Sequence, residues 1–335
     1  MMIWQRGANR SSWTVRIVIV IGFWLLGAWA PVDAATAPPI TTVAFTPDGT
    51  AVVAGSQAGL EVRSWPELVL VARLTTELSN IHDAAFSPDG KLLAAAGGEP
   101  GVNGAVELYR WPQQDLIRRD VPHDDVVYSV AWRSDGEELA LASGDQRVGI
   151  LSATRVSPPH YVEGHSRTVL AAEFLPGNRG LLSGGVDATI RLWDVAARIS
   201  RETFNNHTRT VNDLKMRPSR DDQELPMLAS AGDDRTVRFW HPTVSRLIRF
   251  ARLESAPMEL AWSADGLVLW AACRDGRLRG IDPGSAIVTS SVPGIEGVAY
   301  ALAVAPDGSV VIAGTRGQLR RIGVRKSAGE AGSQR

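Results

Sequence analysis

The sequence has a single cysteine, Cys273, among 335 residues. One cysteine excludes an intramolecular disulfide, a metal site built only from cysteines, and the Cys-x-x-Cys-His attachment of a c-type haem. An excess of one charge is also missing, because 35 basic residues face 36 acidic ones and the formal net charge is −1. Without a positive field, the chain has nothing general to hold nucleic acid or an anionic membrane. No nucleic-acid partner is therefore expected.

Long apolar runs are scarce, and the run from Ile17 to Ala30 has 14 residues, fewer than the roughly 20 that a membrane-spanning helix needs. It follows Arg6, Arg10 and Arg16, and small residues precede Ala35. This pattern predicts a cleavable signal peptide over residues 1–34. We expect export to the periplasm or the extracellular space, with no stable membrane insertion after cleavage. The alternative is an uncleaved segment that anchors the chain to the inner membrane.

Glycine and proline are plentiful, with 32 and 19 residues, which indicates many short elements joined by turns. Seven turn-like strings recur along the chain. They are Thr46-Pro47-Asp48-Gly49, Ser87-Pro88-Asp89-Gly90, Arg133-Ser134-Asp135-Gly136, Leu175-Pro176-Gly177-Asn178, Arg217-Pro218-Ser219-Arg220, Ser263-Ala264-Asp265-Gly266 and Ala305-Pro306-Asp307-Gly308. The intervals between their second residues are 41, 46, 42, 42, 46 and 42. This steady period indicates an array of structural repeats.

Strand-like runs flank each turn, such as Val43-Ala44-Phe45 before the first and Ala51-Val52-Val53 after it. Proline presets φ at the start of such a turn and glycine accepts positive φ at its end, so each string predicts a hairpin. A third run closes each repeat, for example Thr189-Ile190-Arg191-Leu192-Trp193. Short strands at regular spacing without a helical pattern between them indicate an all-β fold.

The period, the turn and the string Gly185-Val186-Asp187-Ala188-Thr189-Ile190-Arg191-Leu192-Trp193-Asp194 resemble the WD40 repeat. The resemblance implies a seven-bladed β-propeller of four-stranded antiparallel blades. It divides the chain into a signal peptide (1–34), the propeller (35–324) and a disordered polar tail (325–335).

Eleven residues before each turn residue lies the position where that family carries a histidine, called here the His slot. The resemblance implies two hydrogen-bonded sets of four side chains. They are His165, Ser183, Asp187 and Trp193 in the fourth repeat, and His207, Ser230, Asp234 and Trp240 in the fifth. The third repeat keeps His123 and Asp145 only, and the remaining slots hold Thr36, Glu77, Leu253 and Ile295.

Histidine, serine and aspartate together would also suit a hydrolase. A catalytic triad occurs once, whereas these sets repeat at the blade period, so we interpret them as a lattice of buried hydrogen bonds. We expect no enzyme activity, cofactor or metal. The alternative is a propeller enzyme or small-ligand binder, such as a lactonase-like hydrolase, with its site at the mouth of the central channel. Two or more convergent carboxylates in the channel would favour that alternative.

Five residues after each His slot the chain enters the innermost strand, at Thr41, His82, Tyr128, Leu170, Asn212, Met258 and Tyr300. Loops held by a rigid scaffold commonly carry recognition. We therefore predict a partner-binding rim made of His82, Tyr128, Arg167, Arg209, Asn212, Asp233, Met258 and Tyr300. The alternative interpretation is a solvated rim without a ligand.

These features predict a non-catalytic scaffold that binds a protein or peptide and is exported from a bacterial cell. The stretch Gly97–Gly104 lengthens one loop of the second repeat. It resembles an insertion in bacterial exported propellers that are sometimes joined to cytochrome c domains. A separate cytochrome c type chain is therefore one candidate partner.

Closure of the ring is a further expectation from the resemblance, since WD40 propellers usually complete the last blade with an N-terminal strand. Here that strand would fall at about residues 28–35, within the segment that a signal peptidase removes. The seventh blade, residues 299–323, is therefore predicted to have three strands unless the N-terminus is retained. Gln318-Leu319-Arg320-Arg321-Ile322 would then be an exposed edge.

Overall fold

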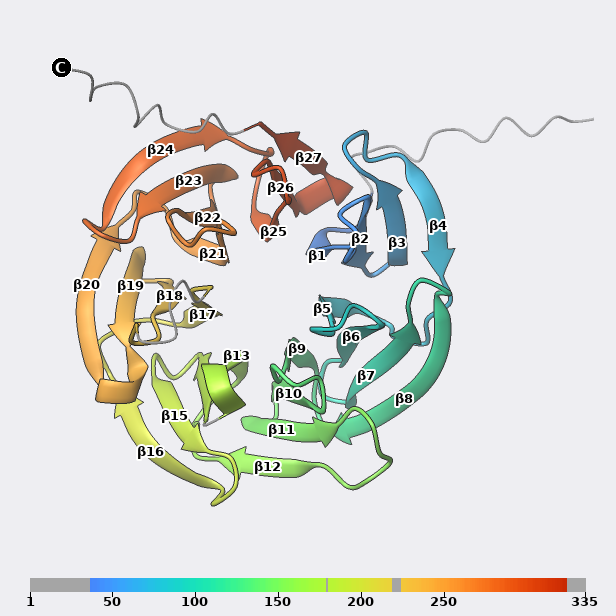
Figure 1. The fold of residues 1–335 in the computed structure, drawn as a ribbon, viewed down its shortest axis with the longest axis horizontal. Helices are drawn as coiled ribbons and strands as arrows, with labels where there is room; N and C mark the ends of the chain where they lie inside the picture. Colours follow the sequence, from blue (N-terminus) through green and yellow to red (C-terminus); the bar gives the residue numbers. More distant parts are fainter. Residues whose placement is uncertain (1–36, 179, 219–223, 324–335) are drawn as a thin grey trace, which may run out of the picture.

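The computed structural model describes residues 37–178, 180–218 and 224–323. In this part of the chain, strands form seven antiparallel sheets arranged around a common centre as the blades of a propeller (Figure 1). The all-β, seven-bladed fold predicted from the sequence is confirmed. The predicted signal peptide, the tail at 325–335 and Thr36 lie outside the described residues.

The first four blades contain four strands each, with the first strand innermost (Figure 1). Their bounds are β1 (Ile40–Phe45), β2 (Ala51–Ser56), β3 (Gly59–Ser64) and β4 (Leu70–Leu74); β5 (Ile81–Phe86), β6 (Leu92–Glu99), β7 (Asn103–Arg110) and β8 (Asp115–His123); β9 (Val127–Trp132), β10 (Glu138–Ser143), β11 (Arg147–Ser152) and β12 (His160–Glu163); and β13 (Val169–Phe174), β14 (Leu181–Gly185), β15 (Ile190–Asp194) and β16 (Ile199–Phe204).

Blades five and six also have four strands, whereas blade seven has three in the described part of the chain. Their bounds are β17 (Val211–Met216), β18 (Leu228–Gly232), β19 (Thr236–His241) and β20 (Arg246–Arg252); β21 (Pro257–Trp262), β22 (Leu269–Cys273), β23 (Arg277–Asp282) and β24 (Ile287–Pro293); and β25 (Ala299–Val304), β26 (Val310–Gly314) and β27 (Leu319–Ile322). Short 3-10 helices connect strands at three places in the described ranges: η1 (Pro176–Asn178), η2 (Pro242–Val244) and η3 (Thr315–Gly317).

The turn between the first two strands is built as the sequence predicts in blades one, two, three, six and seven. In blade one, Gly49 has φ +69° and its N–H donates to the carbonyl of Thr46. The Asp48 carboxylate accepts from the Thr46 hydroxyl at 2.6 Å and from the Thr50 N–H at 3.1 Å. Aspartate in this position therefore fixes the turn through local hydrogen bonds.

The apolar core lies between neighbouring blades. Large apolar side chains occupy the last position of innermost strands, as Phe45, Phe86, Trp132, Met216 and Trp262 do. The indoles of Trp132 and Trp262 donate hydrogen bonds to backbone carbonyls of the preceding blade at 2.9 and 3.1 Å. Blades seven and one pack in the same way, with Ile40, Val43, Val52 and Ala54 against Ala301, Val311 and Ala313. Burial of these side chains closes the ring without a disulfide.

The outer edge of blade seven is β27, which among the described residues pairs only with β26. Within the described residues this blade therefore has three strands, whereas the other six blades have the four strands that the resemblance implied. The first described residue, Ala37, lies close to Gly317 at the start of this edge, and Arg321 lies 5.3 Å from the centre of the Trp65 ring in blade one. The strand proposed for residues 28–35 falls outside the described residues.

The stretch at 97–104 is more ordered than a lengthened loop. Strands β6 and β7 continue through it as a hairpin, so that Glu99 pairs with Asn103 and only residues 100–102 form the turn.

In the described ranges of the chain, no helix is both long and apolar enough to cross a membrane.

Candidate functional site

The fourth and fifth blades bring each predicted set of four side chains together. His165 Nδ1 lies 2.9 Å from Asp187 Oδ2, and its Nε2 lies 2.7 Å from Ser183 Oγ. Trp193 Nε1 donates to the same serine oxygen at 2.7 Å. In blade five, the matching distances for His207, Ser230, Asp234 and Trp240 are 3.0, 2.8 and 2.9 Å.

Each of these histidines is buried and bonded at both ring nitrogens. Burial alone would raise the pKa of Asp187, but hydrogen bonds from His165 and Thr189 outweigh it and hold that pKa well below its usual range. Burial lowers the pKa of His207, against the opposing effect of Asp234. A histidine so enclosed has no free nitrogen for a substrate, which fits a structural lattice rather than a nucleophile and base.

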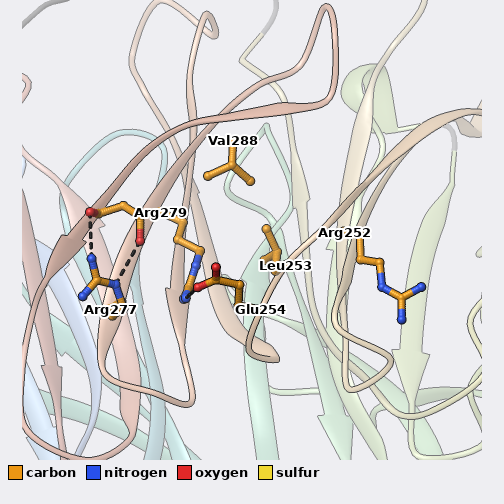
Figure 2. A pocket seen from close by; sticks show the side chains of 7 residues that line it. Arg252, Leu253, Glu254, Arg277, Arg279 and Val288 are labelled. Carbon is orange, nitrogen blue, oxygen red and sulfur yellow. Dashed lines mark hydrogen bonds and ion pairs between the residues drawn. The ribbon is translucent and has the colours of Figure 1, made fainter.

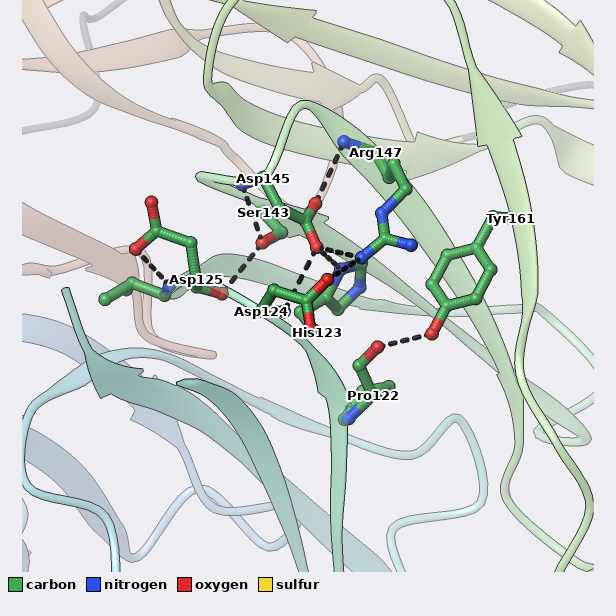
Figure 3. Close-up of polar contacts among 9 residues, drawn as sticks. Pro122, His123, Asp124, Asp125, Ser143, Asp145, Arg147 and Tyr161 are labelled. Carbon is green, nitrogen blue, oxygen red and sulfur yellow. Dashed lines mark hydrogen bonds and ion pairs between the residues drawn. The ribbon is translucent and has the colours of Figure 1, made fainter. Parts of the chain in front are cut away.

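Blade three has an incomplete set, shown in Figure 3. His123 Nδ1 lies 2.8 Å from Asp145 Oδ2, while its buried Nε2 has no partner among the described residues. Arg147 donates to the same carboxylate oxygen at 2.7 Å and lies 4.5 Å from the centre of the Tyr161 ring. The Tyr161 hydroxyl donates to the carbonyl of Pro122. Arg147 thus supplies the second side-chain hydrogen bond to the aspartate, which Thr189 supplies in blade four and Thr236 in blade five.

The predicted rim row occupies one repeated geometric feature. Each of Thr41, His82, Tyr128, Leu170, Asn212, Met258 and Tyr300 is the second residue of its innermost strand, where the pairing register shifts by one residue. Such a β-bulge leaves one residue unpaired and re-aims its side chain. All seven residues are half-buried. The ring therefore presents six kinds of side chain at seven equivalent positions around its centre.

Two pairs of neighbouring blades bring rim residues into contact. The rings of His82 and Tyr128 lie 4.9 Å apart at an angle of 60°. The Asn212 side-chain amide donates to Asp233 and to the carbonyl of Pro257, both at 2.9 Å, and lies 4.0 Å from the Met258 sulfur. Burial lowers the pKa of His82 and raises the pKa of Tyr128. Each pair joins two blades of the rim.

The remaining rim residues are separate. Arg167 and Arg209 are exposed and make no hydrogen bond within the described residues, and Tyr300 does not contact the other predicted rim side chains there. Arg274, which the sequence interpretation missed, donates to Asp233 at 2.9 Å. A signal for Arg274 existed, because it lies directly before Asp275 as Asp233 lies directly before Asp234.

A charged cluster at the centre of the ring was also missed. Lys215 lies 3.6 Å from Asp213, and burial would lower its pKa, but the fields of Asp213, Glu259, Asp83 and Glu173 raise that pKa above its usual value. These carboxylates come from blades two, four, five and six. Burial raises the pKa of Glu173 to about 7 and raises that of Glu259 well above its usual range. The row three residues beyond the rim signals two members, since Glu173 and Lys215 interrupt a run of alanines there.

Part of this cluster is structural. Asp83 accepts from the N–H of Val130 at 2.9 Å, and Asp213 accepts from the N–H of Leu260 at 2.8 Å. In each case the donor belongs to the innermost strand of the next blade, so the carboxylate links two blades. Within the described ranges, no group of three histidine, cysteine or acidic side chains is arranged to hold a metal ion.

Comparison with known proteins supports the WD40 repeat family. The family model described as WD domain, G-beta repeat, matches residues 157–194 and 199–241, the segments that carry the two complete hydrogen-bonded sets. The chain is 35% identical over 126 residues to coronin-7 of Bos taurus, covering 35% of this chain and 13% of that protein. It is 36% identical over 86 residues to nuclear distribution protein PAC1 of Ajellomyces capsulatus (strain H143), covering 25% of this chain and 18% of that protein.

A third relative is E3 ubiquitin-protein ligase COP1 of Arabidopsis thaliana, with 28% identity over 116 residues, covering 34% of this chain and 16% of that protein. The chain spans less than a fifth of the length of these curated relatives. Their names describe different activities, so the likeness concerns the repeat and not a shared activity.

Proposed function

We propose that this protein is a non-catalytic scaffold that binds a protein or peptide at the end of the propeller that carries the rim residues. The observation that carries the proposal is the bulge repeated in all seven innermost strands. It holds seven side chains of six kinds around one end of a rigid ring. A surface of that kind suits recognition, because the scaffold fixes positions while the side chains remain free to differ.

The composition of the rim supports a protein partner. Tyrosine, methionine and arginine are enriched at protein interfaces, and the rim contains Tyr128, Met258 and Tyr300 with Arg167 and Arg209 nearby. Asn212 and Asp233 are held in place by their own hydrogen bonds, so little side-chain entropy would be lost on binding at that part of the rim.

Site-specific cross-linking tests this proposal. A photo-activatable phenylalanine analogue replaces Tyr128 on the rim or, as a control, exposed Ile199 on the outer strand β16. We expect a partner of defined mass to be cross-linked from position 128 and not from position 199. Equal cross-linking from both, or cross-linking from 199 alone, would contradict a binding site on the rim.

We further propose that the chain is a bacterial exported propeller, delivered to the periplasm or beyond by residues 1–34. The support is the sequence alone: three arginines followed by an apolar run of 14 residues. Fractionation of expressing cells with N-terminal sequencing tests this proposal. A mature N-terminus at Ala35 in the exported fraction is expected, and an intact N-terminus in the cytoplasmic fraction would contradict it.

A small-ligand site at the centre of the ring is a second candidate, favoured by the carboxylates that gather around Lys215. Of these, Glu259 makes no hydrogen bond in the described part of the chain. Metal analysis of purified protein tests this candidate, with Glu259→Gln as the variant and exposed Glu163→Gln as the control. A stoichiometric metal that is lost only with Glu259→Gln would favour ligand binding at the centre over the scaffold.

A further inference from the structure

A cavity of about 510 Å³ lies where blade six meets the last strand of blade five, and none of the predicted rim residues lines it (Figure 2). It is bordered by the end of β20, by β23 and by β24. The lining residues are Arg252, Leu253, Glu254, Arg277, Arg279, Val288 and Ser291. Three arginines and one glutamate make this lining positive.

Blade six differs from blades four and five at this place. Leu253 occupies the His slot, and Ala271 and Ile281 stand where the serine and tryptophan of the complete sets stand. Asp275 is bonded instead by Arg279, whose Nη1 and Nη2 donate to its two oxygens at 2.9 and 2.7 Å. The Arg279 side chain is 2% exposed. A buried guanidinium thus takes the place of the histidine as the partner of the aspartate.

Blade six carries one more positive charge at this place than blades four and five. In blade five, Asp234 lies 3.5 Å from Arg238, and in blade four the residues at the same positions are Asp187 and Arg191. Threonine stands two residues after the aspartate in both of those blades, whereas blade six has Arg277 there. Asp275 therefore balances only one of the two guanidinium groups on β23.

Both guanidinium groups are held in place while keeping donors unused. Arg277 donates through Nε and Nη2 to the hydroxyl and carbonyl of Ser291, both at 2.9 Å. Its Nη1 makes no hydrogen bond in the described part of the chain. Arg279 makes a longer contact of 3.4 Å with Glu254, whose side chain is 89% exposed. A guanidinium has five N–H donors, so each of the two groups can donate a hydrogen bond to a further oxygen.

We infer that this cavity binds a carboxylate of a partner protein, such as the side chain of an exposed aspartate or glutamate. The Glu254 carboxylate occupies part of the position in the free protein and is displaced by the partner. Arg277 and Arg279 together carry one more positive charge than Asp275 balances. This single excess charge matches a singly charged carboxylate better than a doubly charged phosphate. The inference deepens the proposed scaffold function by naming a group that the partner presents.

Binding of a fluorescent tetraglutamate peptide tests the inference, measured by anisotropy at low ionic strength because exposed charge pairs are screened by salt. Arg277→Gln should weaken binding by roughly three- to tenfold, the range of a partly exposed charge-assisted hydrogen bond. Glu254→Gln should strengthen it by about threefold, because it removes the internal carboxylate. Arg279 is left unchanged, since its loss would leave Asp275 unpaired.

Two control variants separate this site from general electrostatics. Arg246→Gln removes an exposed charge at the other end of β20, and Glu163→Gln removes one on β12. We expect both control variants to change the affinity for the peptide less than Arg277→Gln does, because each removes only a charge that lies outside the cavity. Melting temperatures show whether each variant is folded.

Three results would overturn the inference: no measurable binding of tetraglutamate, equal effects of Arg277→Gln and Arg246→Gln, or no effect of Glu254→Gln. Tighter binding of a matched phosphoserine peptide would replace the carboxylate by a phosphate and overturn the assignment in that form. These outcomes leave the rim proposal intact, because cross-linking at position 128 tests it independently. Failure of that cross-linking likewise leaves the peptide measurement valid.

Discussion

Lys215 and Asp213 lie two residues apart on β17, and the Lys215 Nζ approaches the Asp213 Oδ1 to 3.6 Å at the centre of the ring. This one ammonium is shared with Glu173, Glu259 and Asp83 from three other blades. One cation cannot stabilise four carboxylates equally, and so the acids that are poorly compensated bind protons more strongly when the ring is folded.

The stability of the protein should therefore depend on Glu173 in a pH-dependent way. Its pKa is about 7 in the folded ring, above its ordinary value of 4.5, so the folded state binds more protons than the unfolded state between these pH values. The free energy of unfolding that this group contributes consequently falls as pH rises from about 4.5 to 7. Glu173→Gln should melt a few degrees higher than the wild type at pH 8, with little difference near pH 4.

The measurement is the melting temperature of both proteins across that pH range. Glu163→Gln is a matched control, because Glu163 is exposed on β12 and lies outside the cluster. A difference between Glu173→Gln and wild type that stays constant from pH 4 to pH 8 would contradict the assigned role of burial.

The complete hydrogen-bonded sets should contribute more to stability than the incomplete one. His165→Ala removes one hydrogen bond from Asp187 and one from Ser183 in a buried site, and each loss costs about 1–3 kcal/mol in the free energy of unfolding. His123→Ala should cost less, because Asp145 keeps Arg147 and the second histidine nitrogen already has no partner in the described part of the chain.

Urea unfolding measures both costs, and exposed His160→Ala serves as the control. Partner binding should survive in His165→Ala wherever the protein remains folded, and the same holds for Asp187→Ala. Normal stability with lost binding in either variant would show that the set acts in recognition instead.

The rim should carry recognition without carrying stability. Tyr128→Ala and Arg167→Glu are expected to weaken partner binding while changing the melting temperature little, because Arg167 is exposed and Tyr128 is only half-buried. Arg246→Glu on β20 is the matched control for the charge reversal. If neither these variants nor His82→Ala and Tyr300→Ala alter binding, the site lies on a side or on the opposite end.

The edge of blade seven should exchange its amide hydrogens faster than an interior strand. β27 pairs on one side with β26, whereas β15 of blade four lies between β14 and β16. Amides at 317–323 are therefore expected to be less protected than those at 189–193. Equal protection in mature, monomeric protein would mean that a further strand covers this edge.

The sequence by itself determined the blades. The turn strings, their period of 41 to 46 residues and the strands beside them depend on local backbone chemistry, which neighbouring residues specify. The sets around His165 and His207 were accessible for a related reason, because a repeat places equivalent residues at equivalent positions. Even the bulge row was found as a fixed offset from the His slot.

Only the tertiary structure decided which unlike residues meet. Asp83, Glu173, Lys215 and Glu259 come together because the ring closes. The repeat places them at the third or fifth position of the innermost strands, but it does not specify which blades carry a charge there. Arg279 is likewise the partner of Asp275 in the folded protein. Blade six has Leu253, Ala271 and Ile281 in place of the histidine, serine and tryptophan, so no histidine network reaches that aspartate. A repeat predicts what every blade shares, whereas electrostatics and cavities arise from the positions at which the blades differ and from how closure brings those positions together.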